Sequence, residues 1–119
     1  MARVLIVDDS MFMRKVLGDI LTKNGHQVVG EAPSGEEALT MIAKAKPDIV
    51  TLDLVMPGMG GMEVLRKTKG DASRPTFVIV SAVGQQSEIR EAMALGAADF
   101  LVKPFDEAAV VKTVNAVVK

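Results

Sequence analysis

Side chains that could do chemistry follow four short apolar runs of this sequence. An acidic pair follows the first run, and a single acid, a hydroxyl and an amine follow three later ones: Asp8 and Asp9, then Asp53, Ser81 and Lys103. Carboxylates are hard oxygen ligands that suit Mg²⁺, which commonly uses one or two of them with a phosphate oxygen and several waters. If the three acids meet, they predict a magnesium site with one cation and one hydroxyl beside it.

One of these carboxylates could also act as a nucleophile toward phosphorus. Three neighbouring carboxylates repel one another unless positive charge intervenes. With a metal ion and Lys103 offsetting that charge, an aspartyl phosphate can form. We favour Asp53 as the acceptor because it stands alone before the loop 54–58, whereas Asp8 and Asp9 are adjacent and suit a shared metal.

The apolar runs indicate the elements that position these residues. They are unbroken and rich in β-branched residues, which is typical of strands covered by helices on both faces. The predicted strands occupy 4–7, 28–29, 49–52, 77–80 and 100–102. Helical patterns alternate with them, at 12–21, from a capping box at Ser34 and Glu37, at 59–69, at 85–95 and at 110–118.

This alternation predicts an α/β fold, a (βα)5 unit with a doubly wound parallel five-stranded sheet. In an open parallel sheet the carboxyl ends of all strands lie along one edge, where ligands bind. Residues far apart in the sequence can therefore converge at that edge.

The composition fits one ordinary globular domain. The chain has 119 residues, of which 49% are apolar and 24% charged, with a net charge of -1 and no cysteine. Such a balance allows a core and provides no basic field for nucleic acid, and the lack of cysteine excludes thiolate metal sites. No apolar stretch approaches the length of a membrane span. We expect a cytoplasmic protein that binds no nucleic acid and does not insert into a membrane.

Five segments, taken in order, resemble the response-regulator receiver domains of two-component phosphorelay systems. They are VLIVDDS at 4–10, DIVTLD at 48–53, Met56-Pro57, VSA at 80–82 and GAADFLVKPF at 96–105. The resemblance covers almost the whole chain and is strongest to single-domain chemotaxis regulators. It implies one receiver domain over residues 1–119, with a flavodoxin-like sheet in the strand order 2-1-3-4-5.

The resemblance also implies a role for each acid. A histidine kinase would phosphorylate Asp53. Mg²⁺ would be bound directly by Asp9, Asp53 and the backbone carbonyl of Val55, and through water by Asp8.

The other residues of the site would stabilise and report the phosphoryl group. By the same resemblance, Lys103 pairs with the phosphoryl group and forms a cis peptide with Pro104. The Ser81 hydroxyl and the Ala82 backbone bind phosphoryl oxygens. Ser81 and Phe100 form the switch, although the family's tyrosine is replaced by phenylalanine at Phe100.

Two further positions correspond to those with which the family tunes hydrolysis of the phosphoryl group. They are Val55 and Val83. Neither side chain can hydrogen-bond an attacking water, so we expect a persistent phosphoryl state. Gly60 departs from the acid or amide usual before the glycine that matches Gly61.

The implied output is non-covalent. Phosphorylation would alter the surface formed by the fourth helix, fifth strand and fifth helix, which would bind a target such as the flagellar or archaellar motor switch. We expect a monomer that is not an enzyme, although it accepts a phosphoryl group and slowly loses it, with a phosphatase as a possible third partner.

Three alternatives remain open. The chain could be a stand-alone receiver of a phosphorelay or a receiver excised from a larger regulator. It could be a Mg²⁺-dependent phosphatase with an aspartate nucleophile, but those enzymes resemble D-x-D where this chain has Asp8-Asp9. A flavin-binding protein is disfavoured because Trp and Tyr are absent.

Several remaining residues have structural interpretations. Ser10 suits an N-cap of the first helix, Glu31 an edge strand, and His26 a solvated turn. The four phenylalanines are expected in the core, and Met56, Met59 and Met62 are expected to pack against it.

Overall fold

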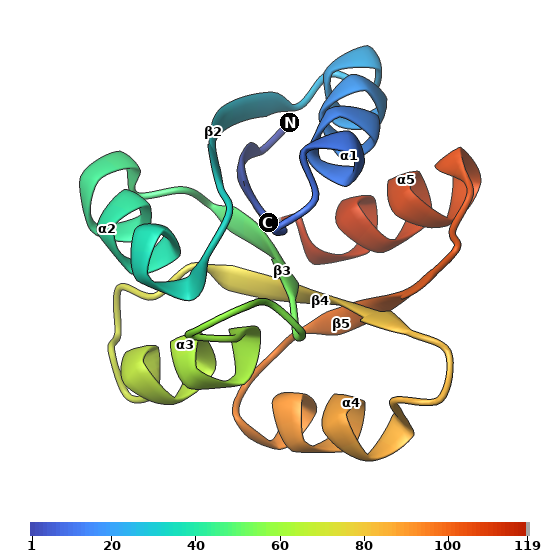
Figure 1. Cartoon of the computed structure of the whole chain (residues 1–119). Helices are drawn as coiled ribbons and strands as arrows, with labels where there is room; N and C mark the ends of the chain where they lie inside the picture. Colours follow the sequence, from blue (N-terminus) through green and yellow to red (C-terminus); the bar gives the residue numbers. More distant parts are fainter. Residues whose placement is uncertain (119) are drawn as a thin grey trace.

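The computed structural model describes residues 1–118, in which strands and helices alternate strictly (Figure 1). The elements are β1 (Arg3–Val7), α1 (Met11–Lys23), β2 (Gln27–Ala32), α2 (Gly35–Ala45), β3 (Ile49–Asp53), α3 (Gly61–Thr68), β4 (Thr76–Ala82), α4 (Gln86–Ala94), β5 (Asp99–Lys103) and α5 (Glu107–Val117). The predicted order of elements is confirmed. The helices expected at 59–69 and 85–95 are slightly shorter, and β2 is longer than the apolar pair 28–29.

All five strands pair in parallel in the order β2-β1-β3-β4-β5. The predicted doubly wound α/β fold and its strand order are therefore correct. β1 and β3 are neighbours at the centre, with Val7 opposite Leu52, and β3 places Asp53 opposite Val80 of β4. The strand ends that carry the chemical residues consequently lie along one edge.

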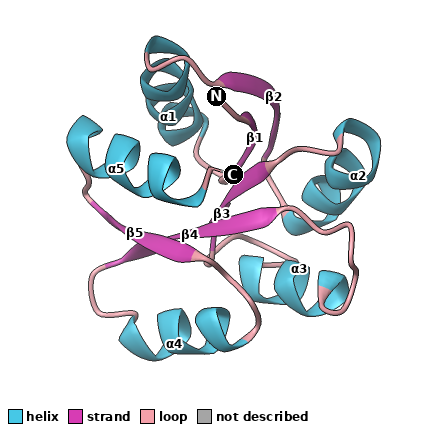
Figure 2. Cartoon of the chain, turned by 180° about the vertical axis from the view of Figure 1, so that it is seen from behind, coloured by secondary structure: helices cyan, strands magenta, loops and turns pink. Residues whose placement is uncertain are grey.

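Helices cover both faces of the sheet, with α1 and α5 on one face and α2, α3 and α4 on the other (Figures 1 and 2). Alternate residues of one strand pack against opposite helix layers. In β1, Val4 and Ile6 pack under α1 and α5, whereas Leu5 and Val7 pack under α2 and α3. Because both faces of each inner strand are buried, its sequence is an unbroken apolar run.

Side-chain caps begin three of the helices. Ser10 accepts a hydrogen bond from Met13 N–H at 3.2 Å, as predicted for an N-cap of α1. Ser34 accepts one from Glu37 N–H at 3.2 Å, which is half of the predicted capping box. Asp106 caps α5 through Ala109 N–H at 2.8 Å. These caps satisfy amides that have no partner within the helix.

The prediction for His26 is wrong. This residue is 7% exposed; its Nδ1 accepts a hydrogen bond from Ala2 N–H at 3.0 Å, and its Nε2 lies 3.1 Å from Asn115 Oδ1. Since Nδ1 is an acceptor, Nε2 carries the ring proton and donates a hydrogen bond to the Asn115 side-chain oxygen. His26 therefore joins the start of β1 to α5.

The expectation that all phenylalanines are buried is only partly right. Phe77 is fully buried and Phe105 packs against the core, but Phe12 at the start of α1 is 72% exposed and Phe100 on β5 is 41% exposed. By contrast, Met56, Met59 and Met62 pack in or against the core as expected. Within residues 1–118, no helix is both long and apolar enough to span a bilayer.

Candidate functional site

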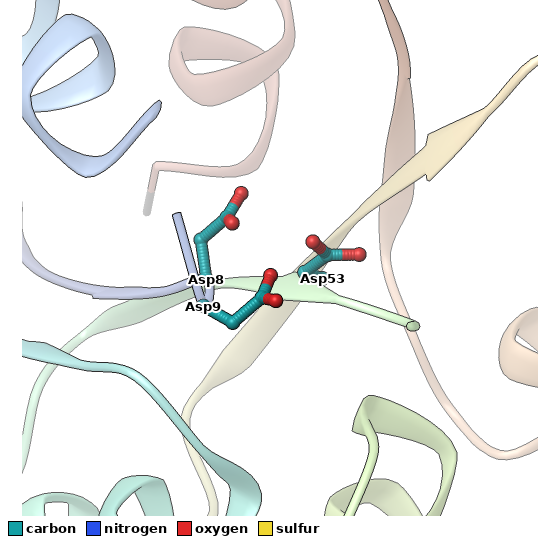
Figure 3. A group of neighbouring side chains, drawn as sticks. All are labelled: Asp8, Asp9 and Asp53. Carbon is teal, nitrogen blue, oxygen red and sulfur yellow. The ribbon is translucent and has the colours of Figure 1, made fainter. Parts of the chain in front are cut away.

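The three predicted acids meet at the carboxyl-terminal edge of the sheet. Asp8 and Asp9 follow β1, and Asp53 ends the neighbouring strand β3 (Figure 3). One carboxylate oxygen from each lies within 4.8 Å of the others. Asp8 and Asp53 are buried whereas Asp9 is exposed, so the cluster is open to solvent on the side of Asp9.

Lys103 supplies the positive charge of the cluster. Its Nζ donates hydrogen bonds to Asp8 Oδ2 at 3.0 Å and to Asp53 Oδ2 at 3.2 Å. The ammonium group thus bridges the two buried carboxylates, although it comes from β5 at the sheet's edge. The peptide between Lys103 and Pro104 is cis.

The local environment shifts the pKa of both partners upward. Burial raises the pKa of Asp53 above its ordinary value of 3.8, and the charge of Asp8 adds to this, while the Val55 N–H and Lys103 oppose it. Burial alone would lower the pKa of Lys103, but its hydrogen bonds and the charges of Asp8 and Asp53 outweigh that effect and raise it. Lys103 is therefore held as a cation beside a carboxylate that is costly to ionise.

Backbone contacts fix the carboxylates in place. Ser10 N–H donates to Asp8 Oδ1 at 2.8 Å, and Val55 N–H donates to Asp53 Oδ1 at 3.0 Å. Both are bonds from the residue two positions later, so the turn after each strand orients the acid that precedes it.

Arg14 is a supporting residue that the sequence analysis missed. Its Nη1 donates to the Asp8 carbonyl oxygen at 2.6 Å, and its Nε donates to Glu31 Oε1 at 2.9 Å. The side chain thereby ties the loop after β1 to the edge strand β2, where Glu31 lies as predicted. A basic residue one turn into the first helix was the only signal in the sequence.

Gly61 allows α3 to begin directly beneath Asp53. A Cβ at this position would lie 2.4 Å from the Asp53 carbonyl oxygen, a distance that no side chain tolerates. The first residue of α3 can therefore only be glycine while the backbone of Asp53 stays where it is.

The Ser81 hydroxyl, near the end of β4, is a buried polar group without an internal partner in residues 1–118. Ser81 is 1% exposed, and its Oγ has no hydrogen-bond partner among the described residues. It lies one residue beyond Val80, the partner of Asp53 in the sheet. A buried hydroxyl without a partner is costly, so an oxygen-rich ligand beside Asp53 would relieve that cost.

The remaining predicted residues are Val55, Val83 and Phe100. Val55 and Val83 are 63% and 76% exposed. Phe100 lies with Ala82, Val83, Ile89 and Met93 along an apolar groove between α4 and β5. None of the residues that line this groove belongs to the acid cluster, so the groove and the acid cluster are separate sites.

The donor set fits Mg²⁺. All candidate ligands are oxygens, they come from three carboxylates at the sheet edge, and Asp9 leaves one side open for water. This is the chemistry that a hard divalent cation with retained waters requires. Asp8, Asp9 and Asp53 are the residues that would hold it.

Comparisons with known proteins define the class. The model of the response regulator receiver domain matches residues 4–115, and the chain belongs to this family. Among solved structures, the response regulator domain of Thermotoga maritima CheB superposes with a TM-score of 0.84 at 34% identity, over 96% of this chain and 91% of that one.

Within the family, the chain is a homologue of the chemotaxis protein CheY. The protein of that name from Thermotoga maritima is 46% identical over 117 residues, 98% of each chain. The CheY of Bacillus subtilis is 43% identical over 113 residues, covering 95% of this chain and 94% of that protein.

Proposed function

We propose that this chain is a chemotaxis response regulator whose phosphoacceptor is Asp53. The observation that carries the proposal is the Lys103 ammonium, which bridges Asp8 and Asp53, together with the unpartnered Ser81 hydroxyl near the end of the neighbouring strand β4. A phosphoryl group brings negative charge and acceptor oxygens. The Lys103 cation and the unpartnered Ser81 hydroxyl are groups that could bind them. The CheY homologues support the chemotaxis assignment.

The proposed reaction is transfer of a phosphoryl group to a carboxylate oxygen of Asp53. That oxygen attacks phosphorus while the bond between phosphorus and the donor atom breaks. The electron pair of the broken bond stays on the donor atom, which is an imidazole nitrogen for a phosphohistidine kinase or an acetate oxygen for acetyl phosphate. Bound Mg²⁺ would supply charge neutralisation for the phosphoryl oxygens. Asp8, Asp9 and the Val55 carbonyl would hold this ion with Asp53.

The chain's own groups receive the new charge. Phosphorylation adds negative charge and acceptor oxygens at Asp53. Lys103 then has a new partner in the phosphoryl group, and the Ser81 hydroxyl and Ala82 N–H can donate to its oxygens. Inward movement of Ser81 vacates space for the Phe100 ring, which is 41% exposed before the change.

The proposed output is a change of the α4-β5-α5 surface. The strands that carry Ser81 and Phe100 lead into α4 and α5, so a local charge event can bias that surface between two packings. Its proposed target is a motor switch component, with a histidine kinase as donor and a phosphatase as a further partner. We propose that the chain acts as a cytoplasmic monomer and performs no catalytic turnover on an external substrate.

The test uses acetyl phosphate with Mg²⁺ and intact-mass measurement. We expect one phosphoryl group per chain, and none in Asp53→Asn or in the presence of a chelator. Unchanged incorporation in Asp53→Asn would contradict the mechanism.

Two other functions are separated by further outcomes. An aspartate-nucleophile phosphatase would turn over a phosphomonoester steadily, whereas a response regulator would show a single labelling that decays. A receiver that serves a phosphorelay or a larger regulator would be labelled in the same way but would not bind a motor switch component in its beryllofluoride form.

A further inference from the structure

The amide of Ala82 is already occupied in this structure. Its N–H donates to the side-chain Oε1 of Gln85 at 2.6 Å. Ala82 directly follows Ser81 at the end of β4, and Gln85 is the residue before the first turn of α4. One of the donors proposed for the phosphoryl group therefore has an internal acceptor from the same loop.

The loop is built to bring Gln85 back to this amide. Gly84 has φ of +93°, which places it in the left-handed region and reverses the chain between Ala82 and Gln85. Gln85 is the N-cap residue of α4, yet its side chain caps no amide of that helix. Its carboxamide is instead committed to Ala82.

We propose that Gln85 is a positioning residue that competes with the phosphoryl group for the Ala82 N–H. One N–H donates well to one acceptor at a time, so a phosphoryl oxygen must displace the Gln85 carboxamide to gain this bond. Gln85 thereby raises the cost of the phosphorylated arrangement. This inference rests on the function proposed above.

Displacement of the Gln85 side chain would also change the lining of the groove between α4 and β5. Gln85 lines the apolar groove between α4 and β5 together with Ile89, Met93 and Phe100. When a phosphoryl oxygen takes the Ala82 N–H, the released side chain must move against this groove and at the start of α4. The exchange of one hydrogen bond therefore links the charge at Asp53 to the proposed output surface without requiring any motion of the sheet.

The neighbouring glutamine offers a matched control. Gln86 lines the same groove but is exposed and does not donate to or accept from Ala82 among the described hydrogen bonds. Gln85→Leu removes the competing oxygen at similar volume, and Gln86→Leu makes the same chemical change one residue later. Gln85→Glu keeps an acceptor oxygen and adds a charge.

The first measurement is amide hydrogen exchange of Ala82 by NMR in the free protein. The wild-type amide should be protected, and exchange should accelerate about threefold to tenfold in Gln85→Leu, the range expected for loss of one net hydrogen bond. Gln85→Glu and Gln86→Leu should retain protection. Equal exchange in Gln85→Leu and wild type would show that the contact is not formed, which overturns the inference.

The second measurement is the affinity for beryllofluoride in the presence of Mg²⁺. Gln85→Leu should bind about threefold to tenfold more tightly than wild type, Gln86→Leu within twofold, and Gln85→Glu more weakly. Circular dichroism should show the same fold in all four proteins. If wild type binds but Gln85→Leu and Gln86→Leu do not differ, the inference falls and the phosphoacceptor function stands. If wild type binds no beryllofluoride and takes no phosphoryl group from acetyl phosphate, both fall.

Discussion

At the scale of single residues, charge balance at the sheet edge governs the ionisation of Asp53. Asp53 is 6% exposed and lies against Asp8, so its ionised form depends on Lys103 and on one backbone N–H. That arrangement leaves the carboxylate short of positive charge. A divalent cation would supply the missing positive charge, and phosphorylation of Asp53, which adds negative charge, would increase the need for it.

The deficit predicts a pH-dependent gain in stability from Asp53→Asn in metal-free protein. The pKa of Asp53 is raised above 3.8, so the folded state binds this proton more tightly than the unfolded state. Stability then falls as pH rises from 3.8 through the raised value, and ionised Asp53 destabilises the fold at neutral pH. In urea titrations with a chelator, the advantage of Asp53→Asn should be greatest at neutral pH and shrink on acidification.

The exposed acid Asp19, whose side chain is 71% exposed, supplies the control. Asp19→Asn should change the unfolding free energy by less than about 0.5 kcal/mol at every pH. An Asp53→Asn protein less stable than wild type at neutral pH would contradict the assigned direction of the Asp53 shift.

The valines beside the site predict a long-lived phosphoryl group. Val55 is 63% exposed and offers no hydrogen bond to an attacking water. Val55→Asn should shorten the lifetime by about tenfold, the effect of one hydrogen bond gained in the transition state. Decay of the acyl phosphate, followed after removal of acetyl phosphate, measures this. A lifetime equal to that of Val55→Leu would refute the role of polarity.

At the scale of elements, the site depends on where helices and strands meet. The register of β1, β3 and β4 pairs Val7 with Leu52 and Asp53 with Val80, so Asp8, Asp53 and Ser81 lie at the same edge of the sheet. The turns after β1 and β3 and the start of α3 then fix the direction of each acid. Substitutions at these junctions should therefore change the geometry of the site, although they alter none of its functional groups.

Gly61→Ala tests the junction of β3 and α3. A Cβ would meet the Asp53 carbonyl oxygen at 2.4 Å; because this atom belongs to the backbone and cannot turn aside, we expect a cost toward the upper end of the range of about 1–3 kcal/mol for overpacking, above the gain of about 0.5–1 kcal/mol from alanine in a helix. We expect lower stability and weaker beryllofluoride binding. Gly18→Ala is the matched change, because its nearest contact is 3.8 Å away, and it should stabilise by about 0.5–1 kcal/mol. Equal effects of the two substitutions would contradict the steric argument.

His26 tests the connection between the start of β1 and α5. His26→Leu leaves the buried Ala2 N–H without an acceptor and Asn115 without its donor. The expected loss of unfolding free energy is about 1–3 kcal/mol. Asn115→Leu should cost less, and the double variant should cost less than the sum of the two single variants. Strict additivity would show that the two side chains do not interact.

At the scale of the whole molecule, the fold was predictable because each inner strand lies between two helix layers. Burial on both faces makes an unbroken apolar run, and parallel order brings the residues after Val7, Leu52 and Val80 to one edge. The acid cluster follows from that topology together with residue type.

Other features depend on distances that no local pattern encodes. His26 is a core residue because it meets Asn115, 89 positions away. Phe12 on α1 belongs to neither core layer, and Phe100 lies on the edge strand β5 in the open groove beside α4, so both are exposed. The contact between Ala82 and Gln85 is local, but it depends on a reversal at Gly84 that the sequence patterns considered did not anticipate.

The assignment of Asp53 as phosphoacceptor is tested by mapping the position of the acyl phosphate. The protein is treated with acetyl phosphate and Mg²⁺, the acyl phosphate is reduced with borohydride to the corresponding alcohol, and the modified residue is identified by peptide mass spectrometry. Modification is expected at Asp53 alone, at one group per chain. Modification at Asp8 or Asp9, or at no acid of the cluster, would contradict the assignment.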